Sequence, residues 1–278
     1  ILTRKSNLKP QTGALTCSSH ETELRVKNKT DAFARFTKAT DELKQRIIAN
    51  SLGEVGTGKT FFWLGAPGPI VVQTMDLGLE GVVEPFARNK DIYVADYDIG
   101  QTVGEAFTHA KAVEARDKFI ADFEDAVTKA RTVVWDRETD VWKLFYFAEF
   151  GTDDAYGAAP PKDWDRLKGH IRRMIAMAKA SDLNFGLIQG LRNEWKKSPG
   201  GAKGMGQTGN RIPDGMDDID ALVHTNLMHT RQGKEFSIRV GKSRGPGGFD
   251  IQDETFTDIS FVDLAQMIFP ESSEDDWK

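Results

Sequence analysis

The sequence predicts an α/β fold with a mostly parallel central sheet, helices on both faces and a C-terminal hairpin. Short apolar runs alternate with segments of helical periodicity, and this alternation is typical of parallel sheets. The first apolar run leads directly into a glycine-rich loop. Two later strand-like runs are separated only by a short turn that contains Gly233, which predicts the hairpin.

Each element follows from its local pattern. We expect an N-terminal arm and helix at residues 1–44, with Thr30 as N-cap, then the α/β core at 45–270 and an acidic, unstructured tail at 271–278. Glycine content predicts a mobile loop at 197–215. The expected strands are 47–49, 69–72, 92–95, 132–136, 185–189, 221–230 and 235–241. One helix is expected to start near residue 58, and further helices are expected at 79–87, 103–130, 141–150, 163–180 and 261–268.

Composition excludes several classes of protein. With one cysteine, Cys17, the 278-residue chain has no internal disulfide framework, which fits a reducing compartment such as the cytoplasm. No apolar run approaches the length of a membrane span, so we expect no membrane partner. The net charge of -5 excludes a uniformly basic surface, and any nucleic-acid site must be a local basic patch.

A complete G-x-x-x-x-G-K-[ST] pattern (Walker A) follows the first strand. Its glycines let backbone N–H groups turn toward phosphates, Lys59 supplies a positive charge to the β- and γ-phosphates, and the Thr60 hydroxyl is a ligand for Mg²⁺. The preceding strand and following helix are the context that this motif requires, so we expect ATP and Mg²⁺ as cofactors. The expected nucleotide-binding residues are Gly53, Glu54, Val55, Gly56, Thr57, Gly58, Lys59 and Thr60.

Binding of Mg²⁺ and activation of water both require acidic residues near this motif. Asp136 closes an apolar strand and is the expected partner of Mg²⁺, with a helix-capping surface acid as the alternative. Three acids are candidates for activating water, namely Asp76, Glu80 and Glu138, and each alone fits a solvated surface position equally well.

Polar residues mark two further strand ends. Gln189 follows an apolar strand directly and is a candidate sensor of the γ-phosphate, because ligands bind at this edge of an open α/β sheet. Lys242 and Arg244 end a later strand, where they suit contact with a γ-phosphate in the same or a neighbouring subunit. A solvated strand end is the alternative for each.

The segment from 192 to 211 is the local basic patch. It contains one acid, Glu194, and several glycines, and a flexible basic segment with an aromatic side chain suits a nucleic-acid backbone and a stacked base. A solvated loop without a ligand is the alternative. The residues expected to bind DNA are Arg192, Trp195, Lys196, Lys197, Lys203 and Arg211.

Taken in order along residues 45–250, these motifs resemble the RecA-like P-loop ATPases, most closely phage-encoded members that act in recombination and single-strand annealing. The resemblance implies that Asp76 or Glu80 activates water, that Gln189 couples the γ-phosphate to a DNA-binding loop, and that the late basic pair reaches the ATP of an adjacent protomer. It also implies a homo-oligomer, either a ring or a filament.

The expected function is therefore ATP hydrolysis coupled to binding of single-stranded DNA. A P-loop kinase acting on a small molecule or a polynucleotide is one alternative, since the 192–211 segment also suits a lid. A nucleotide-dependent assembly protein with little turnover is the other.

Overall fold

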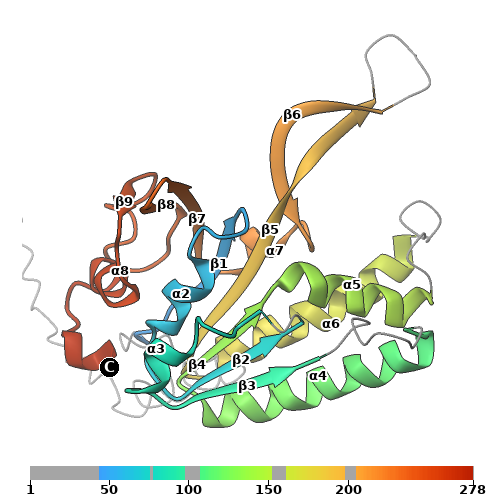
Figure 1. Cartoon of the computed structure of the whole chain (residues 1–278), viewed down its shortest axis with the longest axis horizontal. Coiled ribbons are helices and arrows are strands. Elements are labelled where there is room, and N and C mark those ends of the chain that lie inside the picture. The colour runs from blue at the N-terminus through green and yellow to red at the C-terminus, as the bar shows by residue number, and fades with distance from the viewer. Residues whose placement is uncertain (1–43, 76–77, 98–106, 152–160, 198–204, 278) are drawn as a thin grey trace, which may run out of the picture. The chain divides into compact units, whose positions relative to one another are not determined.

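The structure is a computed structural model that describes residues 44–75, 78–97, 107–151, 161–197 and 205–277 (Figure 1). Residues 1–43 of the predicted N-terminal arm and helix, together with Asp76 and Lys203, lie outside these ranges. Contacts along the chain group Lys44–Lys278 into one compact unit.

A mostly parallel sheet forms the centre of this unit. Its strands lie in the order β3-β2-β4-β5-β1-β7-β8-β9, and the pairs from β3 to β7 are all parallel. The last strands turn back as an antiparallel hairpin, with β9 paired to its outer strand. The predicted fold class is confirmed. The strands are β1 (Ile48–Gly53), β2 (Ile70–Thr74), β3 (Ile92–Asp96), β4 (Thr132–Asp136), β5 (Asn184–Lys197), β7 (Thr225–Gln232), β8 (Glu235–Lys242) and β9 (Thr255–Thr257).

Helices cover both faces of the sheet because side chains alternate along each buried strand. In β4, Val133 and Trp135 pack against α4 (His109–Lys129), α5 (Glu138–Phe150) and α6 (Pro161–Ala180). Val134 points to the other face, toward α2 (Lys59–Leu64) and α8 (Phe261–Ile268). Short helices complete the unit, namely α3 (Glu84–Ala87), α7 (Ile219–Leu222) and the 3₁₀ turn η2 (Glu274–Trp277). Among the described residues, no helix is both long enough and apolar enough to cross a membrane.

The predicted glycine-rich loop at 197–215 is wrong for the residues that the structure describes. β5 continues past the central sheet to Lys197 and pairs there with an antiparallel strand, β6 (Met205–Asp214). Figure 1 shows this β5–β6 hairpin extending away from the sheet. Cross-strand bonds from Thr208 and Asn210 reach the Glu194 carboxylate at 2.8 and 2.9 Å and stabilise the pairing. The hydrogen bond from Lys196, followed by those from Asn210 and Thr208, lowers the pKa of Glu194 to about 2.

The acidic end of the chain also differs from the expected unstructured tail. Trp277 is 1% exposed and packs against Phe261 and Phe269, with ring centroids 6.2 and 5.7 Å apart. Its indole N–H donates to Ser272 at 2.8 Å. Burial of this one large aromatic side chain anchors the segment to the core, while the acids around it stay exposed.

Candidate functional site

The 53–60 loop joins β1 to α2 at the carboxyl edge of the sheet. Lys59 Nζ folds back over the loop and donates to the carbonyls of Gly53 and Glu54, at 2.8 and 2.6 Å. Gly53 has φ +155°, and a Cβ there would lie 2.5 Å from the carbonyl oxygen of His229. Gly58 has φ +82°, a left-handed conformation that favours glycine. The glycines of the motif therefore permit the close passage of this loop over β7.

A hydroxyl and a carboxylate meet beside Lys59. Thr60 Oγ1 donates to Asp136 Oδ1 at 3.1 Å, and the register pairs Asp136 with Thr74 on the neighbouring strand. Burial lowers the pKa of Lys59, while Asp136 and Glu54 oppose this shift. A hydroxyl and a carboxylate are hard oxygen donors, so this pair fits a magnesium ion of the kind that accompanies a bound nucleotide.

A buried polar layer supports the loop from below. The indole N–H of Trp63 donates to Ser51 Oγ at 2.9 Å, and His229 Nε2 lies 3.1 Å from the same oxygen. Burial, with a smaller contribution from Lys59, lowers the pKa of His229 to about 3. The imidazole is thus neutral at physiological pH and acts as a fixed support under Gly53.

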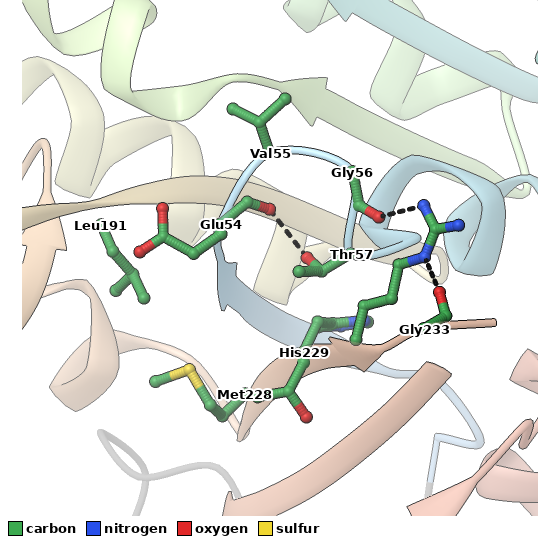
Figure 2. Close-up of a pocket in the computed structure, with 10 residues that line it drawn as sticks. Glu54, Val55, Gly56, Thr57, Leu191, Met228, His229 and Gly233 are labelled. Atoms are coloured by element: carbon green, nitrogen blue, oxygen red, sulfur yellow. Dashed lines mark hydrogen bonds between the residues drawn. The ribbon is translucent and has the colours of Figure 1, made fainter. Parts of the chain in front are cut away.

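A pocket of about 460 Å³ opens between the 53–60 loop, the start of the hairpin and β7. Figure 2 shows Leu191 and Met228 on one side of it and Val55 and Gly56 on the other. The Arg231 guanidinium donates to the carbonyls of Gly56 and Gly233, at 3.4 and 2.9 Å. Hydrogen bonds therefore hold the loop both to Arg231 at the end of β7 and to Lys59.

The three acids proposed for water activation have different positions. Asp76 lies outside the described residues, although β2, which leads to it, ends beside Asp136. Glu80 is exposed in a turn after β2. Glu138 is fully buried, and this burial raises its pKa to about 8. Glu138 therefore has no access to solvent water in this conformation.

Gln189 is the centre of a buried hydrogen-bond network. Its Nε2 donates to Glu138 Oε2 at 2.7 Å and to the Met216 carbonyl at 3.1 Å, and its Oε1 accepts from Asn50 Nδ2 at 2.7 Å. The register pairs Gln189 with Leu52, one residue before the 53–60 loop. The predicted sensor is thus beside the loop, but its amide is engaged by protein groups.

The first turn of α5 holds both strands of the hairpin at their base. Thr139 Oγ1 accepts from the Gly190 N–H at 3.1 Å and donates to the Asp214 carbonyl. One residue, Arg137, separates Asp136 from Glu138 and Thr139 in the chain, and its φ is +69°. The stretch of chain that follows Asp136 is therefore hydrogen-bonded to the base of the β5–β6 hairpin.

Lys203 lies outside the described residues, and the other predicted DNA-binding residues belong to β5 or β6 of this hairpin. Trp195 is 47% exposed, and Lys196 pairs with Glu194 at 2.9 Å. Arg192 is exposed and lies 3.8 Å from Asp214. Arg211 is at the base, where it pairs with Glu54 of the 53–60 loop. The strand register places Trp195 and Lys196 further from the central sheet than Arg192 and Arg211.

Lys242 and Arg244 lie away from the 53–60 loop of their own chain. Lys242 pairs with Asn226 near the start of β7, whereas the loop begins beside His229 three residues further along. Lys242 Nζ donates to the Asp220 carbonyl, and Arg244 is exposed. The strand register therefore directs this basic pair to the opposite edge of the sheet.

Comparison with known proteins adds little. No protein-family model matches the chain, and no curated protein sequence matches it. The crystal structure of the RadB recombinase is similar to 76% of this chain and 86% of its own, with 9% identity and a TM-score of 0.44. A likeness this distant says nothing about function, and the fold class rests on the strand order and register.

Sequence reasoning missed several residues that support the site. Ser51, His229, Asn50 and Thr139 are buried polar residues that connect the loop, Gln189 and the hairpin. The adjacent Asn50 and Ser51 inside an otherwise apolar strand were an available signal, because buried polar side chains nearly always have hydrogen-bond partners.

Proposed function

We propose that this chain is a RecA-like ATPase that binds MgATP on the 53–60 loop and single-stranded DNA on the β5–β6 hairpin. The bond of 3.1 Å between Thr60 and Asp136, beside the folded-back Lys59, is the observation that supports nucleotide binding most directly. Recombination or annealing in the cytoplasm, and the likeness to phage-encoded members, belong to the same proposal.

In this proposal each group has a defined task. Lys59 would exchange its two carbonyl acceptors for phosphate oxygens of the nucleotide. Thr60 and Asp136 would hold Mg²⁺, and the metal would supply positive charge against the phosphates. Asp76 or Glu80 activates water. Gln189 transmits nucleotide state through Glu138 and Thr139 to the hairpin, because these bonds form a direct connection between the two regions.

The basic pair acts between subunits. Lys242 and Arg244 lie at the edge of the sheet opposite the 53–60 loop of their own chain, so a γ-phosphate within reach belongs to an adjacent protomer. This geometry suits a ring or filament in which each nucleotide lies between two copies.

ATPase assays with and without single-stranded or duplex DNA test the proposal. We expect turnover that single strands stimulate and that Lys59→Ala abolishes, while Lys129→Ala, which removes an exposed lysine of a surface ion pair on α4, retains it. Unchanged activity in Lys59→Ala would exclude this loop as the site. Phosphate transfer to an acceptor would identify a kinase, and nucleotide binding without turnover would identify an assembly protein.

Binding of single strands at several salt concentrations tests the hairpin. Neutralising Lys196, Lys197 and Lys203 should weaken binding and make the logarithmic salt dependence shallower by about 0.7 for every phosphate that the variant no longer neutralises. An unchanged slope would remove the hairpin from the DNA site.

A further inference from the structure

The β5–β6 hairpin brings a guanidinium to the 53–60 loop. Arg211 Nη2 lies 2.5 Å from Glu54 Oε1. The same guanidinium donates to the Leu191 carbonyl at 2.9 Å and to the Asn193 side-chain oxygen at 3.2 Å. These bonds fix the direction of the side chain from the opposite strand of the hairpin. Arg211 therefore reaches the loop in a defined orientation.

Glu54 connects this guanidinium to the motif lysine. Its backbone carbonyl accepts from Lys59 Nζ at 2.6 Å, while its carboxylate pairs with Arg211. Figure 2 shows Glu54 between Thr57 and Leu191, all of which line the same pocket. Two cations thus contact one residue of the loop, one on each of its acceptor groups.

We infer that Arg211 is a polyphosphate-binding residue which the hairpin supplies to the 53–60 loop of its own chain, and that Glu54 holds it in place until a nucleotide binds. This inference rests on the proposed nucleotide site and assigns Arg211 to it instead of to the DNA surface. A guanidinium forms paired hydrogen bonds with phosphate as readily as with carboxylate.

The exposure of the pair favours this exchange of partners. The Arg211 and Glu54 side chains are 43% and 54% exposed, and an ion pair this open to solvent contributes little free energy. A triphosphate carries more negative charge than one carboxylate and competes effectively for the guanidinium. Because Arg211 belongs to the hairpin, nucleotide binding would then change the contact that fixes the hairpin base to the loop.

Opposite effects of two substitutions test this inference. Affinity for an unhydrolysable MgATP analogue is measured by calorimetry on the full chain without DNA. Arg211→Gln should weaken binding about tenfold, the loss expected for one charged hydrogen-bonding group. Glu54→Gln should tighten binding severalfold, because it removes the competing carboxylate. In the double variant the gain from Glu54→Gln should disappear.

Arg239→Gln is the matched control, because Arg239 forms a similarly exposed pair with Asp253 at 2.7 Å on β8. It should change nucleotide affinity by less than about twofold, which separates a local contact from loss of net charge. Equal affinity of Arg211→Gln and the unaltered chain would overturn the inference, as would weaker binding by Glu54→Gln. Failure of the unaltered chain to bind nucleotide would overturn the proposed function as well.

Discussion

Replacing Gly215 with alanine tests the buried hydrogen-bond network of Glu138 and Gln189. Gly215 has φ +128°, where an alanine is strained by about 1–3 kcal/mol. Its Cβ would lie 2.3 Å from Glu138 Oε2 and 3.0 Å from Gln189 Nε2, the two atoms that share a 2.7 Å hydrogen bond. Separating them leaves buried polar groups unpaired, at about 1–3 kcal/mol. We expect Gly215→Ala to lower the free energy of unfolding by about 2–6 kcal/mol.

Urea unfolding followed by tryptophan fluorescence measures this loss. Gly209→Ala is the control, because Gly209 has φ +83° but no atom within 4 Å of a Cβ, so that only backbone strain of about 1 kcal/mol is expected. If the two variants lose the same stability, crowding at Glu138 is refuted. A second check combines Gly215→Ala with Glu138→Ala. The second substitution removes the colliding carboxylate, so the double variant should lose less stability than the sum of the two single variants.

Three other predictions concern the end of the chain, pH and assembly. Trp277→Ala should lower the free energy of unfolding by about 3–5 kcal/mol in the same urea assay. A loss below about 1 kcal/mol would contradict the burial of Trp277 and support the predicted unstructured tail. Burial and neighbouring cations lower the pKa of His224 from 6.5 to about 4, so the unfolded chain takes up the proton first and stability falls as pH drops through this interval. His224→Gln should flatten the dependence of melting temperature on pH between 6.5 and about 4, and an identical slope would contradict the shift. Mixing Arg244→Ala with Lys59→Ala subunits should restore part of the ATPase activity if the basic pair acts between protomers, whereas no recovery in confirmed mixed oligomers would exclude that role.

The local patterns of the sequence were sufficient for most of the secondary structure. Alternating apolar runs predicted the parallel strands, and the helix at Phe261–Ile268 was predicted at its observed bounds, where Ser260 and Asp263 form a capping box. The Gly53–Thr60 motif predicted the strand before it and the helix after it, because a phosphate-binding loop of this kind lies between these two elements. These features depend on residues that are neighbours in the chain.

The hairpin, by contrast, could not be predicted from residue type. Glycines and polar side chains in the 192–211 segment favour a loop in isolation, and only pairing between β5 and β6, with Glu194 bonded to Thr208 and Asn210, makes them strands. Trp277 was likewise assigned to a tail because its neighbours in sequence are acidic. Its ring contacts come from Phe261 of α8 and from Phe269, the residue after that helix.

The sequence by itself determined that this chain carries a phosphate-loop motif on an α/β sheet, that Asp136 ends a buried strand, and that its basic residues are concentrated in one segment. Only the tertiary structure decided how these parts are connected. Gln189 is engaged by Glu138, Arg211 pairs with the motif loop, and Lys242 lies at the opposite edge of the sheet. The physical reason is that strand register and cross-strand partners are set by packing between distant segments, which local sequence patterns do not encode.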